Sequence, residues 1–196
     1  MSSAQAEARE GLERLASAVD HAKELLDVHR RQSQLGGESR ARVATVAEAL
    51  SSLQAMVSVD LASRGGRFDL DVSPAARTQQ VDGLLLVRAL VNGARNALDA
   101  FDAEPAGVPP RLTLRVELDD DQLLFVLVDN GPGFEGAGEQ FFEDGRTTRA
   151  RGSGLGLGSA RRAIESLGGR VRLTSPGPGR GAEFLVSLPL RPGETS

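Results

Sequence analysis

The spacing of apolar residues predicts that the chain begins with two helices. Each carries a seam, meaning a stripe of mostly apolar residues along one helix face. The first seam recurs at intervals of three and four residues and comprises Leu12, Leu15, Val19, Ala22, Leu26 and His29. After a turn at 34–39, the same spacing returns in Val43, Val46, Leu50, Leu53 and Val57. Heptad seams of this kind predict an antiparallel helical hairpin, which we expect to pair with a second copy in a four-helix bundle. The alternative is that the hairpin packs on the C-terminal domain of its own chain.

Beyond residue 66 the apolar pattern switches between a period of two and a helical period. Alternation predicts strands at 67–72, 111–118, 122–129, 170–175 and 182–188. Helical periodicity predicts helices at 80–101 and 158–167. Because the strands fall into hairpins rather than into βαβ units, the pattern predicts an α+β fold. We therefore expect a helical hairpin at 1–65, a second domain at 66–190 and a tail at 191–196.

Composition narrows the class of protein. The formal net charge is −4, which argues against a general nucleic-acid binder, and the absence of cysteine excludes disulfides and thiolate sites. The chain has no apolar run long enough to span a membrane and no signal-peptide pattern at its start, so we expect a cytoplasmic protein.

A glycine-rich loop at 151–158 directly precedes a helical pattern and reads Arg-Gly-Ser-Gly-Leu-Gly-Leu-Gly. Glycines let the backbone approach a ligand, and a helix start offers unpaired N–H groups, so the loop predicts a phosphate cradle. A flexible loop or a tight turn is the alternative. A P-loop is excluded because the only lysine is Lys23, and a Rossmann loop is excluded because the polar run 144–150 stands where a strand is required.

Two polar positions elsewhere suit nucleotide chemistry. Asn92 and Asn96 are four residues apart and share one helix face, where the Asn96 oxygen suits Mg²⁺ held largely by phosphate and water. Asp129 ends a strand before Gly-Pro-Gly, where its carboxylate can accept a hydrogen bond from an amino group such as that of adenine. The alternatives are asparagines that bond neighbouring backbone, and a turn in which the aspartate bonds its own backbone.

The stretch 146–151 is basic and contains Thr148 and Arg149. Its side chains can donate charge-assisted hydrogen bonds to phosphate. The alternative is a solvated surface run.

Taken in chain order, these motifs resemble the nucleotide boxes of the GHKL ATPases. The matching motifs are Asn-x-x-x-Asn-Ala, Asp-x-Gly-x-Gly, Thr-Thr-Arg, Gly-Ser-Gly-Leu-Gly-Leu, and Gly-Ala-Glu-Phe before Leu-Pro. The superfamily contains sensor histidine kinases, gyrase-type topoisomerases, MutL and the ninety-kilodalton heat-shock chaperones. The resemblance covers residues 67–190 and is greatest to the catalytic domain of the histidine kinases.

The resemblance implies a Bergerat-type α/β sandwich that binds ATP and Mg²⁺ between helices and sheet. It implies that Asn96 is the Mg²⁺ ligand and that Asp129 bonds the adenine amino group. The implied ATP-binding residues are Asn92, Asn96, Asp129, Gly131, Gly133, Thr148, Arg149, Gly152, Gly154, Leu155 and Gly156. One departure is Asp99, which stands where many kinases place a basic or aromatic residue near the phosphates.

The hairpin is similar in layout to the dimerisation and phosphotransfer domain of these kinases, which carries a phosphorylated histidine. His29 falls on the first seam, whereas His21 lies beside it, so we expect His21 to be the catalytic phosphoacceptor. Neither histidine is followed by the acid that the family uses as a base. Asp20 and Glu24 are candidate substitutes.

These observations lead us to expect a histidine-kinase core that autophosphorylates from ATP and passes the phosphoryl group to the receiver domain of a response regulator. The two seams predict a homodimer through the hairpin, and a kinase core of this length leads us to expect a separate sensor or input protein. The alternative is a phosphotransfer hub or partner-switching regulator that binds ATP without autophosphorylating. A serine kinase of the anti-sigma type shares the fold and fits the long hairpin less well.

Overall fold

The computed structural model describes residues 43–104, 107–142 and 156–190. The chain divides into two compact units, Met1–Arg40 and Ala41–Ser196, and all the described residues belong to the second. The expected first arm of the hairpin, with His21 and His29, therefore lies outside the described residues, as does the tail at 191–196.

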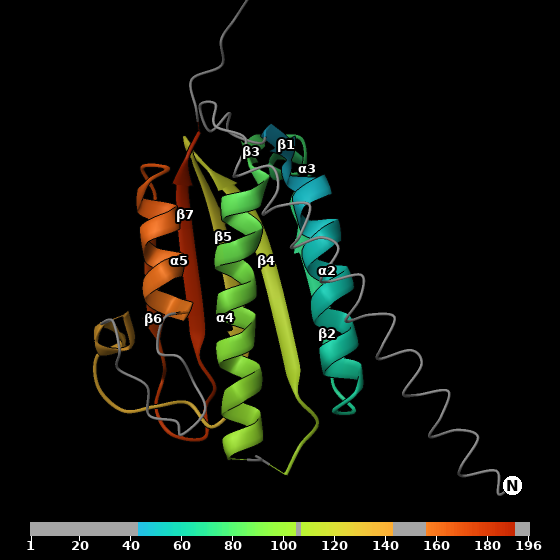
Figure 1. Ribbon diagram of the computed structural model, residues 1–196, viewed down its shortest axis with the longest axis vertical. Coiled ribbons are helices and arrows are strands. Elements are labelled where there is room, and N and C mark those ends of the chain that lie inside the picture. Colours follow the sequence, from blue (N-terminus) through green and yellow to red (C-terminus); the bar gives the residue numbers. More distant parts are fainter. Residues whose placement is uncertain (1–42, 105–106, 143–155, 191–196) are drawn as a thin grey trace, which may run out of the picture. The chain divides into compact units, whose positions relative to one another are not determined.

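A five-stranded mixed sheet forms one layer of the second unit (Figure 1). Its strands, in spatial order, are β2 (Arg67–Val72), β4 (Arg111–Asp119), β5 (Gln122–Asp129), β7 (Glu183–Pro189) and β6 (Arg170–Thr174). β2 pairs with β4 in parallel, and the other neighbours are antiparallel. A second, two-stranded sheet pairs β1 (Val43–Thr45) with β3 (Gln80–Asp82).

Three helices cover one face of the large sheet: α2 (Val46–Ala62), α4 (Gly83–Ala103) and α5 (Gly156–Glu165) (Figure 1). Two further short elements lie among the described residues, α3 (Pro74–Arg77) and the 3₁₀ helix η1 (Gly138–Phe142). Side chains cap the starts of the two longest helices. Thr45 and Glu48 form a reciprocal capping box at α2, and Asp82 Oδ1 accepts a hydrogen bond from Leu85 N at 3.0 Å at α4.

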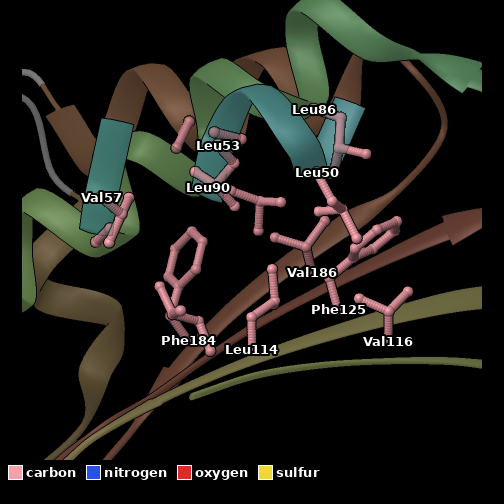
Figure 2. Packing of buried hydrophobic residues seen from close by; sticks show 14 of the residues in the cluster. Leu50, Leu53, Val57, Leu86, Leu90, Leu114, Val116, Phe125, Phe184 and Val186 are labelled. Atoms are coloured by element: carbon pink, nitrogen blue, oxygen red, sulfur yellow. The ribbon is translucent and has the colours of Figure 1, made fainter. Parts of the chain in front are cut away.

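The core lies between the helices and the sheet, as Figure 2 shows. Alternate residues of the central strands point inward, so that Val116, Phe125 and Val186 stand beside one another across β4, β5 and β7. Leu50 and Leu90 meet this layer from α2 and α4. Full burial of side chains of this size contributes about 1.5–3 kcal/mol each.

The second expected arm of the hairpin is part of this sandwich, which corrects its assignment to a separate domain ending at residue 65. Val46, Leu50, Leu53 and Val57 are each no more than 3% exposed, and α2 packs against α4 and β2. A stripe at intervals of three and four shows only that one helix face is apolar, and it suits a domain core as well as a coiled coil. The alternative of packing on the same chain therefore holds for this helix, and Val43 lies in β1 instead.

The remaining predicted elements agree closely with the structure, and the α+β class is confirmed. β2 and β5 have the predicted bounds, and the other predicted strands differ by one residue at their ends. The helix predicted at 158–167 runs two residues earlier, as Gly156–Glu165. The helix predicted at 80–101 is Gly83–Ala103, because residues 80–82 form β3 instead. The elements β1, α3, β3 and η1 were not predicted. Among the described residues, the helices are too short or too polar to cross a membrane.

Candidate nucleotide-binding site

Asn92 and Asn96 are one turn apart on α4, and both are half-buried. The neighbouring face of α4 packs tightly on the sheet, since a Cβ added to Gly93 would lie 2.6 Å from the ring of Phe184. Neither asparagine amide forms a hydrogen bond with the described residues, so the alternative of bonding nearby backbone finds no support there. Both amides are thus available to a ligand.

The end of the glycine loop reaches this asparagine face. Gly156 is the first residue of α5, and a Cβ added to it would lie 3.7 Å from Asn92 Oδ1. One turn away, an Arg88 NH2 group donates to Ser159 Oγ at 3.0 Å and ties α4 to α5. Two motifs separated by more than sixty residues in the sequence therefore meet at the start of α5.

Asp129 ends β5, and its carboxylate is held by the backbone on one side only. Oδ1 accepts from Gly131 N at 2.8 Å and from Ala182 N at 3.1 Å. Among the described residues, no hydrogen bond reaches Oδ2. The turn in which Asp129 bonds its own backbone is therefore present, and it still leaves one carboxylate oxygen available to a donor.

Burial raises the pKa of Asp129 above the ordinary value, and the backbone hydrogen bonds from Gly131 and Ala182 act in the opposite direction. The carboxylate is thus partly desolvated. A hydrogen bond from a ligand to such an acceptor is stronger than one made in open water.

The glycines after Asp129 leave no room for side chains. A Cβ added to Gly131 would lie 2.9 Å from Asp129 Oδ1 and 3.4 Å from the ring of Phe101 on α4. Gly133 has φ +63°, and its Cβ would lie 2.4 Å from the carbonyl oxygen of Gly177. The same helix therefore borders Gly131 near its C-terminus and Gly156 nearer its middle, with Asn96 between.

Several predicted site residues lie outside the described residues, namely Thr148, Arg149, Gly152, Gly154 and Leu155. The sequence patterns did not single out the Ala182 amide, which donates to Asp129, or Ser175, whose hydroxyl donates to the carbonyl oxygen of Gly181 at 2.7 Å. Ala182 belongs to the Gly-Ala-Glu-Phe motif, which could have indicated it. Ser175 had only a weak signal, as a serine before Pro-Gly in the turn between two predicted strands.

The described residues contain no cluster of three or more histidine, aspartate or glutamate side chains that could hold a metal ion. A cation here would need ligands from a bound molecule. The Asn96 oxygen fits this requirement, because Mg²⁺ is usually held by few protein groups together with substrate phosphate and water.

A mixed sheet covered by three helices, with an asparagine face on one helix and an aspartate at a neighbouring strand end, is the arrangement expected of a GHKL-type ATPase domain. The family of histidine kinase-, DNA gyrase B- and HSP90-like ATPases matches residues 81–192. The chain belongs to this family.

Histidine kinases are among its relatives: signal transduction histidine-protein kinase AtoS of Escherichia coli is 33% identical over 129 residues, which is 64% of this chain and 19% of AtoS. Nitrogen regulation protein NtrY of Azorhizobium caulinodans is 33% identical over 124 residues, which is 62% of this chain and 16% of NtrY. This chain therefore corresponds to a small part of that relative.

Solved histidine-kinase structures share the fold. The catalytic domain of histidine kinase ThkA has a TM-score of 0.65 at 19% identity, covering 76% of this chain and 94% of that one. Full-length ShkA in complex with AMPPNP has a TM-score of 0.63 at 25% identity, covering 93% of this chain and 39% of ShkA.

Proposed function

We propose that the chain is the ATP-binding catalytic part of a histidine kinase of two-component signalling. The observation that carries the proposal is the Asp129 carboxylate, with one oxygen fixed by two backbone N–H groups and the other available. The family match, the histidine-kinase relatives and the AMPPNP complex of ShkA support it.

At the adenine end, Asp129 Oδ2 accepts a hydrogen bond from the 6-amino group of the base. Gly131 and Gly133 lie beside the carboxylate without side chains, and the base occupies the space that they leave. The two N–H groups on Oδ1 hold the carboxylate in one orientation before the nucleotide arrives. That preorganisation reduces the entropy lost on binding.

At the phosphate end, the Asn96 oxygen would hold Mg²⁺, and Asn92 lies one turn before it, next to Gly156. The bound ion would neutralise charge on the transferring phosphoryl group. Thr148, Arg149, Gly152, Gly154 and Leu155 are proposed to line the phosphates together with Gly156. The backbone N–H groups at the start of α5 favour negative charge there.

The phosphoryl group is transferred to a histidine, for which we propose His21, and from there to an aspartate of a response-regulator receiver domain. The imidazole nitrogen attacks the γ-phosphorus as the bond to the β,γ-bridging oxygen breaks and ADP leaves. The proposed assembly is a homodimer formed through the N-terminal segment, where the sequence predicts the first arm of the hairpin.

The alternative is a phosphotransfer hub or partner-switching regulator that binds ATP without autophosphorylating. One observation favours it: Ala22 follows His21 and Arg30 follows His29, where the family places an acid. Asn92 and Asp129 would serve the same binding role in both cases.

Incubation with γ-labelled ATP and Mg²⁺ tests the proposal. We expect an acid-labile, alkali-stable label that is lost in His21→Gln, while His29→Gln retains label and mainly loosens the helix packing. Label that persists in both variants would contradict a histidine-kinase mechanism. A wild-type chain that binds ATP in calorimetry but takes no label would support the hub.

A further inference from the structure

The turn between β6 and β7, residues 175–181, is bound to the segment that follows Asp129 through one hydroxyl group. Ser175 Oγ accepts from Phe134 N at 3.1 Å and from Gly177 N at 3.1 Å, and it donates to the carbonyl oxygen of Gly181 at 2.7 Å. A serine hydroxyl has one proton to donate and two lone pairs to accept with. The half-buried Ser175 therefore uses its full hydrogen-bonding capacity here.

Backbone hydrogen bonds carry this connection on to Asp129. Gly181 N donates to Gly131 O at 3.0 Å, and Asp129 N donates to Ala182 O at 3.0 Å. Ala182 N, directly after the residue that Ser175 bonds, is one of the two donors to Asp129 Oδ1. The hydroxyl thus lies one residue away from a group that orients the carboxylate.

The packing leaves little freedom for these segments to shift separately. A Cβ added to Gly181 would lie 2.0 Å from the carbonyl oxygen of Asp129, and one added to Gly133 would lie 2.8 Å from Ser175 Oγ. A displacement of the turn is therefore passed to the strand end that bears Asp129.

We propose that Ser175 is a positioning residue for recognition of the purine 6-amino group. Its hydrogen bonds fix the turn 175–181 relative to the segment after Asp129. Ala182 N then keeps Asp129 Oδ1 in place, and Oδ2 faces the base. The inference rests on the proposed function and adds a determinant of base selectivity to it. Asn92, Asn96 and Gly156 lie on α4 and α5, so this role leaves the phosphate side unchanged.

Comparing two nucleotides that differ at position 6 of the purine distinguishes this positioning role from a general effect of Ser175 on folding. ATP carries the 6-amino group, whereas inosine triphosphate carries at that position an oxygen, which accepts hydrogen bonds and cannot donate one to Asp129. A site built to bond one group discriminates strongly against an analogue that lacks it. The measured quantity is the Kd for inosine triphosphate divided by the Kd for ATP, determined by calorimetry with Mg²⁺ on the full chain.

We expect Ser175→Ala to weaken ATP binding about threefold to tenfold, the fold-change of one ordinary hydrogen bond, and to leave inosine triphosphate binding nearly unchanged. Ser175→Thr retains the hydroxyl and should keep the wild-type ratio. Ser187→Ala is the matched control, because Ser187 lies on β7 and its hydroxyl bonds none of the described residues. If Ser175→Ala does not fold, Ser175→Cys, which is close in size and a weak donor, replaces it.

An unchanged ratio in a folded Ser175→Ala protein would overturn the proposal, and so would an equal loss of both affinities. A wild-type chain that binds ATP no better than inosine triphosphate would refute the role of Asp129 and this inference with it. A wild-type chain that binds neither nucleotide would refute the proposed function itself. A ratio that falls in Ser175→Ala and recovers in Ser175→Thr would support the inference.

Discussion

Replacing Asp129 with asparagine tests the proposed adenine contact with a change of almost no volume. In the wild type, Oδ1 accepts from Gly131 N at 2.8 Å and from Ala182 N at 3.1 Å. An asparagine must keep its single oxygen at that position, because its NH₂ group cannot accept from those donors. The NH₂ group then takes the place of Oδ2, where it faces the adenine amino group donor to donor.

The size of the effect follows from the lost bond. A hydrogen bond to a charged group contributes about 1.5–3 kcal/mol. Asp129→Asn should therefore weaken ATP binding roughly 10- to 150-fold, at about 1.4 kcal/mol for each factor of ten. The fold should persist, because the oxygen that accepts from the two backbone groups is retained.

Thermal stability should not fall in this variant. Burial raises the pKa of Asp129, which means that the ionised group is less favourable in the folded protein than in the unfolded chain. At neutral pH a neutral isostere removes that penalty, so we expect an unchanged or higher Tm together with weaker binding.

Titration calorimetry with ATP and Mg²⁺ measures the effect, and Asp119→Asn is the control. Asp119 is exposed and pairs with Gln122, at the opposite end of the β4–β5 hairpin from Asp129. The control should bind ATP as the wild type does. An Asp129→Asn protein whose affinity stays within twofold of wild type would refute the assigned role of Oδ2.

Three further predictions concern pH, the core and a glycine. Because the pKa of Asp129 is raised, ATP affinity should begin to decline with falling pH above the ordinary aspartate pKa of about 3.9, as the carboxylate becomes protonated. Over the same pH interval, protonation of Asp129 should increase folding stability. Calorimetry from pH 8 downward measures the affinity, and Asp129→Asn should show a flatter pH profile. Leu53→Ala should lower the free energy of unfolding by about 2–5 kcal/mol without changing the mass measured by light scattering. The control is Val59→Ala, which should be tolerated because Val59 is 59% exposed. Dissociation of a dimer by Leu53→Ala would contradict the packing of α2. Gly133→Ala should abolish ATP binding in calorimetry, because the new Cβ would lie 2.4 Å from a carbonyl oxygen and the backbone is strained at φ +63°. The control is Gly107→Ala, because Gly107 has a similar φ of +71° but open space around its Cβ position. Equal effects of the two substitutions would exclude the steric argument.

Local pattern was sufficient to predict most of the elements and the class of site. Each strand of the large sheet lies within one residue of its predicted bounds, since alternation records which side of a strand is buried. The order of the boxes, with Asn96, Asp129 and the glycine loop, was sufficient to indicate the superfamily that the family match confirms.

The partners of these elements were decided only by tertiary structure. The α2 seam had the same spacing as the first seam, yet Leu50 and Leu53 are buried in the sandwich. A period of three and four residues specifies an apolar face and carries no information about the surface that covers it.

The contacts between residues of the site could not be predicted from the sequence either, because a local pattern does not identify which distant residues come into contact. Gly156 beside Asn92, and Ala182 beside Asp129, are contacts between residues more than fifty positions apart. Ser175 belongs to no recognisable motif. Only the close packing of two turns brings four backbone groups, Phe134 N, Gly177 N, Gly177 O and Gly181 O, within hydrogen-bonding distance of its hydroxyl. The sequence by itself determined which residues have the chemistry to bind a nucleotide, and the packing of helices and turns on the sheet determined which of them act together.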